Sequence, residues 1–192
     1  MWFSHLSGLR RALLCRLCYN ADMEISLLDV LAARDRRSAY QKQLLARYKG
    51  ACLAVFTVVT PGAVKQTPES RRLFDAGIRS ISRIVQRYEL VPLLFEAHAY
   101  PTGNEGYLAV KTDPYFLKTE LCKLEESAPY GRLWDMDVIG PDGVPIDRER
   151  VGFEPRGCIV CGKPGRACAS RRLHSMEDVQ SAVRALAETL PD

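Results

Sequence analysis

Long apolar segments are missing from this sequence: no uninterrupted run reaches the roughly 18 apolar residues that a transmembrane helix needs. Internal repeats are also missing, and the formal net charge is only +4. A basic excess this small does not indicate nucleic acid, because proteins that bind it usually carry a concentrated basic surface. These absences exclude membrane-spanning helices, collagen-like chains and repeat architectures, and we expect neither a membrane nor a nucleic-acid partner.

The composition that remains is typical of a globular protein. The 192 residues are 47% apolar and 26% charged, which allows a sizeable core without disulfide bonds. Seven cysteines are an odd number, which argues against a complete disulfide framework. Near the N-terminus, Arg16 interrupts the apolar stretch that follows Arg11 after four residues, too few for a signal peptide. We therefore expect a cytoplasmic protein.

Capping residues and apolar periodicity predict the order of secondary structure. Residues 1–22 are expected to be an N-terminal extension and 23–192 a single domain, with Met23 as an alternative start. Helices are predicted after the N-caps Ser26, Thr67, Asp113 and Ser175. Strands are predicted at 51–60, 91–97, 106–110 and 133–139, and a Cys-, Gly- and Arg-rich loop at 152–173. This order predicts an α+β fold with a single mixed sheet flanked by helices, for which a nucleotidyltransferase-like arrangement is one candidate.

The first predicted helix runs from Ser26 to about Tyr48 and is ended by Gly50. Its spacing places Leu28, Leu31, Leu45 and Tyr48 on or near one apolar face. Its middle, residues 34–37, is rich in arginine and is predicted to face solvent.

Charge is distributed in blocks along the chain. Residues 1–50 contain nine basic and four acidic residues, 148–172 contain seven and two, and 89–147 contain four and eleven. A fold that brings the acidic middle beside the basic flanks could hold metal-binding carboxylates next to anion-binding cations. Separate solvated faces are the alternative explanation.

The segment Gly131-Arg132-Leu133-Trp134-Asp135-Met136-Asp137 is the first candidate for chemistry. In a strand, side chains two residues apart share a face, so Asp135 and Asp137 project together. Paired carboxylates suit Mg²⁺ with substrate phosphates, as phosphoryl and nucleotidyl transfer require. Gly131 and Arg132 add a flexible turn and a cation that can bind phosphate. A solvent-facing strand that merely carries two acids is the alternative.

The second candidate is the group Cys158, Cys161, Cys168 and His174. These soft or borderline ligands lie within seventeen residues of Gly- and Pro-rich sequence, which resembles a zinc knuckle. Nearby cations, Arg156 among them, would favour thiolates. Reduced structural cysteines without a metal are the alternative.

A third candidate follows the first predicted strand, where Pro61-Gly62 precedes Lys65 and Arg71. Anions bind at helix N-termini because free amides and the helix dipole stabilise negative charge, and both cations would reinforce this. A capped helix with exposed cations explains the pattern equally well. His98, which precedes Thr102 and Gly103, is expected to be structural.

Several of these motifs occur together in a fixed order. They are Pro61-Gly-x-x-Lys65, Phe74-x-x-Gly77, Thr102-Gly103, Tyr130-Gly-Arg-Leu-Trp-Asp-Met-Asp-Val138, and a cysteine-rich block from Pro155 to His174. The set resembles the apo-citrate lyase phosphoribosyl-dephospho-CoA transferase family, also called holo-citrate lyase acyl-carrier synthases, over about residues 24–186.

The resemblance implies a defined reaction. Such enzymes transfer 2'-(5''-phosphoribosyl)-3'-dephospho-CoA from its 5''-triphosphate precursor to a serine of the citrate lyase acyl-carrier (gamma) subunit, and pyrophosphate is released. We hypothesise that Asp135 and Asp137 hold Mg²⁺ and that Arg132 acts with them as a catalytic group. Substrate binding is assigned to Lys65, Arg71, Gly131 and Arg156. Two other functions remain open: a zinc-stabilised module that docks an acidic partner without catalysis, and a related transferase for another lyase or decarboxylase carrier.

Overall fold

The computed structural model describes residues 23–163 and 165–191. The strands are β1 (Cys52–Val58), β2 (Pro92–Tyr100), β3 (Gly103–Val110) and β4 (Trp134–Ile139). The helices are α2 (Leu27–Arg47), α3 (Pro68–Arg87), α4 (Pro114–Glu126), α5 (Gly165–Arg171) and α6 (Met176–Glu188), with short 3-10 helices η1 (Pro129–Leu133) and η2 (Arg148–Val151). The predicted extension at 1–22 lies outside the described residues. Within them, no helix has both the length and the apolar character needed to cross a membrane.

The predicted α+β class and the single sheet flanked by helices are confirmed. The four strands have the order β2-β3-β1-β4, and every neighbouring pair is antiparallel. The expected mixture of parallel and antiparallel pairs is absent from this sheet, because each helical crossover skips one strand. The α3 crossover from β1 to β2 leaves room for β3, and the α4 crossover from β3 to β4 leaves room for β1. This is the split β-α-β arrangement of ferredoxin-like folds.

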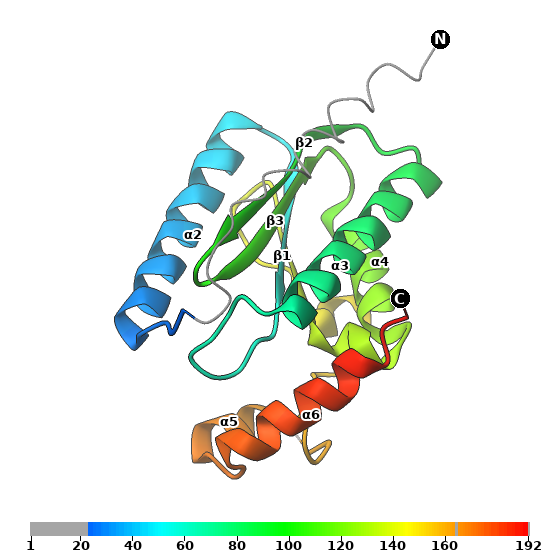
Figure 1. Cartoon of the computed structure of the whole chain (residues 1–192). Helices are drawn as coiled ribbons and strands as arrows, with labels where there is room; N and C mark the ends of the chain where they lie inside the picture. Colours follow the sequence, from blue (N-terminus) through cyan, green and yellow to red (C-terminus); the bar gives the residue numbers. More distant parts are fainter. Residues whose placement is uncertain (1–22, 164, 192) are drawn as a thin grey trace.

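The two faces of the sheet are covered by different helices (Figure 1). On one face, α3 and α4 bury the main apolar cluster around Phe56, Trp134 and Met136. Gly77 of α3 lies directly over the Phe56 ring, where any Cβ would overlap it, so this helix packs unusually close to β1. On the other face, α2 covers a smaller cluster around Leu44, and α5 and α6 lie together beyond one end of the sheet.

The orientation predicted for α2 is wrong in its first half. Leu28 and Leu31 are 76% and 44% exposed, whereas Leu44 is buried. Arg36 and Arg37, expected to be solvated, instead donate to the buried carboxylate of Glu105. The cause is the surface that α2 covers: Leu44 packs on an apolar cluster, whereas Arg36 and Arg37 meet the buried carboxylate of Glu105.

Local sequence signals were sufficient for most helix starts. Ser26, Thr67 and Ser175 each close a capping box, and Asp113 caps α4 through the backbone amide of Tyr115. The predicted hairpin also forms, with β2 paired to β3. The loop predicted at 152–173 contains the short helix α5, whose seven residues have too little apolar periodicity to be recognised.

Candidate active site and cysteine-histidine cluster

The face of the sheet beneath α2 carries a row of polar groups. Directly opposite residues in antiparallel strands share a face, and the register aligns Glu96, Tyr107, Val55 and Asp137 across all four strands. Two residues further along these strands, on the same face, His98 pairs with Glu105 and Thr57 pairs with Asp135. The two aspartates therefore extend a polar surface that spans the sheet and ends at the edge strand β4.

Asp135 and Asp137 point to one face, as their spacing predicts. Both are exposed, while Trp134, Met136 and Val138 between and beside them are buried on the opposite face. Protein atoms surround much of the Asp137 carboxyl group even though the residue keeps contact with solvent. This loss of hydration raises the pKa of Asp137 above its usual value, and repulsion from Asp135 raises it further. A divalent cation between the two carboxylates would relieve that repulsion.

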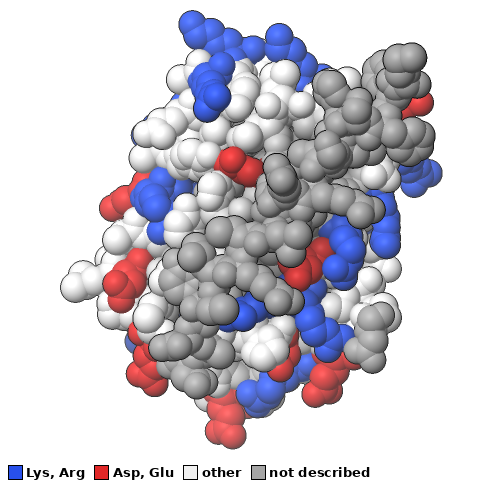
Figure 2. Space-filling model, turned by 45° about the horizontal axis from the view of Figure 1, so that its top comes forward, with Lys and Arg blue, Asp and Glu red and all other residues white. Residues whose placement is uncertain are grey.

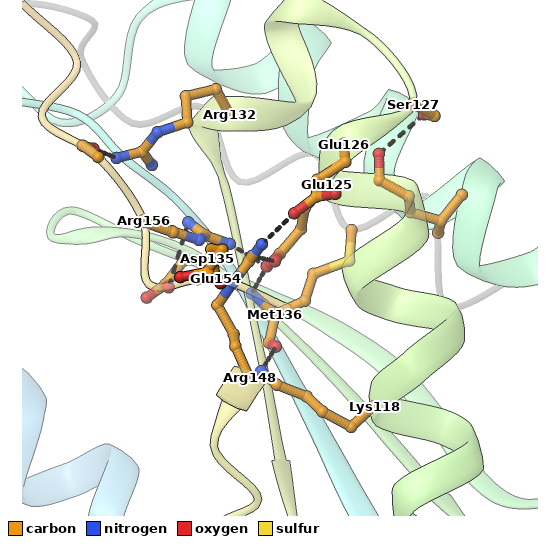
Figure 3. A network of polar contacts seen from close by, with 12 residues as sticks. Lys118, Glu125, Glu126, Ser127, Arg132, Asp135, Met136, Arg148, Glu154 and Arg156 are labelled. Carbon is orange, nitrogen blue, oxygen red and sulfur yellow. Dashed lines mark hydrogen bonds and ion pairs between the residues drawn. The ribbon is translucent and has the colours of Figure 1, made fainter. Parts of the chain in front are cut away.

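At Met136, the outer edge of β4 is bonded to charged side chains of α4 (Figure 3). The backbone amide of Met136 donates to Glu125, and its carbonyl accepts from the ammonium of Lys118 at 2.7 Å. Glu125 and Lys118 are both buried and both come from α4. This pairing satisfies the edge backbone groups and holds β4, with its two aspartates, in place.

Three arginines, Arg132, Arg148 and Arg156, line a cavity of about 180 Å³, called the arginine cavity below. Arg148 and Arg156 are paired with carboxylates, both of them with Glu125, whereas Arg132 donates to the neutral backbone carbonyl of Gly157. Arg156 also lies 3.8 Å from the Asp135 carboxylate. Burial lowers the pKa of Arg132, and the neighbouring cations Arg156 and Arg148 lower it further. An anion that entered this cavity would thus gain most from Arg132.

The remaining predicted substrate-binding residues lie in different places. Gly131 is buried against α4, where a Cβ would come within 2.7 Å of the Glu125 carbonyl oxygen. Lys65 donates from its ammonium to the carbonyl of Thr60 at 2.6 Å, at the end of β1, and burial lowers its pKa. Arg71 donates to Gln66, whose amide in turn contacts the β2–β3 hairpin. Neither Lys65 nor Arg71 is among the described residues that line the arginine cavity.

A larger cavity of about 610 Å³ lies between the β1–α3 loop and α6. Apolar side chains from both segments line it, together with two cations and three acids: Arg72, Arg184, Glu24, Glu69 and Glu188. The wall formed by the end of β1 and the loop after it includes Val58, Thr60 and Pro61, and β1 is the strand that pairs with β4. The size falls within the range of small-molecule sites, about 300–1,000 Å³.

The predicted cysteine-histidine cluster is assembled in the structure. One donor atom from each of Cys158, Cys161, Cys168 and His174 lies within 4.8 Å of the others. Backbone amides of Cys161 and Val160 donate to the Cys158 sulfur and lower its pKa to about 7. Burial and the neighbouring thiols raise the pKa of Cys168 to about 11. This group could bind a metal ion, and its donor set is compatible with zinc.

A buried carboxylate on β3 was not recognised from the sequence. Glu105 is 2% exposed and accepts from Arg36 at 2.8 Å, Arg37 at 3.0 Å and the Tyr107 hydroxyl at 2.6 Å. The Nε2 atom of His98, a residue expected to be structural, lies 2.9 Å from a carboxylate oxygen of Glu96. The alternation of Glu96, His98 and Tyr100 along β2 is the signal that could have indicated a polar sheet face.

The charge blocks of the sequence do not form a surface of one sign over the described residues on the face drawn in Figure 2. On the face drawn in Figure 2, Lys and Arg side chains lie among Asp and Glu side chains over the described surface. The acidic middle and the basic segment after residue 148 do meet at one place, the network around Glu125, Arg148 and Arg156. The juxtaposition expected from the blocks is therefore local.

Comparison with known proteins agrees with the motifs. The family described as apo-citrate lyase phosphoribosyl-dephospho-CoA transferase matches residues 25–190. Curated proteins of the same description from Escherichia coli O139:H28, Citrobacter koseri and Shigella boydii serotype 18 are each 32% identical over 162 residues, which cover 84% of this chain and 88% of the relative. The resemblance inferred from the motifs is confirmed, and the chain belongs to the apo-citrate lyase phosphoribosyl-dephospho-CoA transferase family.

Proposed function

We propose that this protein transfers 2'-(5''-phosphoribosyl)-3'-dephospho-CoA from its 5''-triphosphate precursor to a serine of the citrate lyase acyl-carrier subunit. Family membership supports the transfer and the carrier. The observation that carries the chemistry is the pair Asp135 and Asp137, exposed on one face, with Arg156 3.8 Å from Asp135 and lining the same cavity as Arg132. Two carboxylates next to a guanidinium are suited to a magnesium triphosphate.

The proposed reaction is a nucleotidyl-type displacement. The serine oxygen forms a bond to the α-phosphorus, the bond from that phosphorus to the β-phosphate oxygen breaks, and pyrophosphate leaves. The serine proton passes to a carboxylate or to water. Mg²⁺ held by Asp135 and Asp137 would supply positive charge to the triphosphate oxygens. Arg132 stabilises the charge that develops on the departing pyrophosphate.

The cavity beside α6 is proposed to receive part of the dephospho-CoA portion. Its apolar lining suits a long, mostly uncharged chain, and Arg72 and Arg184 suit phosphate groups. Cations of the segment 156–172 are proposed to contact the same portion or the acyl-carrier protein. This arrangement places the triphosphate at β4 and the remainder of the precursor toward α6.

Zinc is the proposed occupant of the cysteine-histidine cluster. Thiolate and imidazole donors suit zinc, and four protein ligands leave no open position for substrate. Such closed sites are structural, so this metal is separate from the proposed magnesium.

The transfer is tested by incubating the purified protein with the triphosphate precursor, Mg²⁺ and apo-acyl-carrier subunit, and then weighing the carrier. The expected result is a mass increase equal to the phosphoribosyl-dephospho-CoA group on a single serine, with release of pyrophosphate. Binding of the carrier without a mass change would instead support a docking module. Modification only of a different lyase or decarboxylase carrier would change the assigned substrate.

The ionisation of Asp137 gives a prediction that needs no substrate. Its folded-state pKa is raised, so the ionised carboxyl destabilises the fold at neutral pH, and this penalty disappears as the pH falls below the unfolded value. Asp135→Asn removes the neighbouring charge and should lower the Asp137 pKa. Carboxyl ¹³C NMR titration of both proteins measures the shift, and an unchanged or higher pKa in the variant would contradict it.

Arg132→Ala and Lys65→Ala should lower turnover more than they weaken carrier binding, if both cations stabilise the transition state. A charge-assisted contact of about 2–3 kcal/mol corresponds to roughly 30- to 150-fold in rate. Steady-state kinetics with varied precursor measures the loss, and Lys49→Ala, at an exposed lysine beyond α2, is the control. A change near twofold for Lys65→Ala that vanishes at high salt would assign Lys65 a structural role.

A further inference from the structure

The cysteine-histidine cluster and the arginine cavity are joined by two consecutive residues. Arg156 pairs with Glu125 and lies 3.8 Å from Asp135, and the carbonyl of Gly157 accepts from Arg132. The next residue in the chain is Cys158. Whatever fixes Cys158 therefore also fixes the backbone that presents Arg156 and Gly157 to the proposed reaction site.

The backbone from Cys158 to Lys163 forms a tight turn, which is called the knuckle below. The Cys158 amide donates to the carbonyl of Lys163 at 2.6 Å, and the Gly162 amide donates to the carbonyl of Cys158 at 2.9 Å. Gly162 has a positive φ of 72°, which glycine adopts without strain.

The other donors come from separate segments of the chain. Cys168 lies on α5, and His174 lies directly before Ser175, the N-cap of α6. The Cys161 and Cys168 sulfurs are 3.6 Å apart, close to the roughly 3.8 Å expected between two sulfurs on a tetrahedral zinc ion. The buried Nε2 atom of His174 has no hydrogen-bond partner, so it is available as a ligand.

We propose that zinc bound by Cys158, Cys161, Cys168 and His174 acts as a latch that holds Arg156 and Gly157 against the Arg132 side of the reaction site. The latch rests on the proposed function and on zinc as the occupant. Zinc joins the knuckle to α5 and to the start of α6, and α6 forms one wall of the larger cavity. A single structural ion thus orders the arginine cavity and that wall together.

Removal of the metal has a definite local consequence. The four donor atoms lie within 4.8 Å of one another, so without the ion they have no shared partner that joins the three segments. The hydrogen bonds inside the segment that contains the knuckle, such as the one from the Gly165 amide to the Arg156 carbonyl at 3.3 Å, are local to residues 156–165 and do not connect Cys158 to His174. The knuckle should then open locally while the sheet stays folded.

The first test combines metal analysis with hydrogen exchange, without substrate. The full chain should contain close to one zinc per chain, and Cys168→Ser and His174→Ala should each lower this at least ~10-fold. Amides of Cys158 and Gly162 should exchange at least ~10-fold faster in both variants and in chelator-treated protein, with β1 and β3 unchanged. Cys52→Ala, which removes a buried thiol outside the cluster, should keep the zinc.

The latch would be overturned if protein without zinc exchanged its Cys158 and Gly162 amides as slowly as zinc-loaded wild type. It would also be overturned if a variant that loses zinc exchanged its amides faster throughout β1 and β3. Wild-type protein that contains zinc and shows the expected exchange, but transfers no group to the carrier, would instead overturn the proposed function alone.

The second test is a double-mutant cycle on transfer rate. If zinc acts through Arg156, Cys168→Ser and Arg156→Ala should each lower the rate by ~10-fold or more, and the double variant should lose no more than about twofold beyond the worse single variant. Arg156→Lys, which keeps the charge, should recover part of the loss. Losses that multiply in the double variant would show that the cluster and Arg156 act independently.

Discussion

Asp135→Asn and Asp137→Asn should each lower the rate of group transfer by at least ~10²-fold while leaving the fold intact. Both residues keep contact with solvent, the ion pair between Asp135 and Arg156 is long at 3.8 Å, and asparagine has nearly the same size as aspartate, so neither substitution should disturb the packing. The loss should come from the Mg²⁺ that the carboxylates hold, because a neutral amide is a weaker ligand for a hard divalent cation. The measurement is single-turnover transfer to the acyl carrier over a range of Mg²⁺ concentrations.

Two results separate this role from general damage. Glu149→Gln removes an exposed acid from η2, close in the chain to Arg148, and should leave the rate within about twofold of wild type. Thermal unfolding of both aspartate variants at neutral pH should show a midpoint no lower than that of the wild type, because each substitution removes a charge that contributes to the penalty of holding Asp137 ionised. Near-wild-type turnover in either aspartate variant, with Mg²⁺ present, would remove the pair from the mechanism.

Features set by neighbouring residues were predictable from the sequence. The capping boxes at Ser26, Thr67 and Ser175 depend on side chains three residues apart, and all three helices begin where expected. The shared face of Asp135 and Asp137 follows from the two-residue period of a strand, and the cysteine-histidine spacing indicated a cluster that the fold assembles.

Features set by tertiary pairing were not predictable in the same way. The strand order depends on which strands each crossover skips, and nothing local to β1 or β4 records it. The orientation of α2 was wrong because apolar periodicity assumes an apolar partner surface, whereas Glu105 requires Arg36 and Arg37. Such a pairing joins residues almost seventy positions apart, so helix periodicity alone carries no sign of it.

The same limit applies to Glu125, which contacts both β4 and the arginines of the proposed reaction site. In the sequence it is one of two adjacent acids at the end of α4. In the structure it is buried, accepts from the Met136 amide at 2.9 Å and pairs with both Arg148 and Arg156. Its importance arises from chain segments that meet only after folding.

Glu125→Gln should therefore destabilise the protein by about 3–5 kcal/mol, the usual cost of removing one partner from a buried charge pair. The amide can still accept from Met136, but the side chains of Arg148 and Arg156, only 13% and 20% exposed, lose their shared counter-charge. Urea unfolding should show a lower midpoint with an unchanged slope, because the extent of surface exposed on unfolding stays the same. Glu126→Gln is the matched control: this neighbour pairs with the same Arg148 but is 53% exposed, so its loss should cost no more than about 1 kcal/mol. Equal destabilisation by the two variants would mean that burial does not distinguish them, and that Glu125 does not anchor β4 and the arginines.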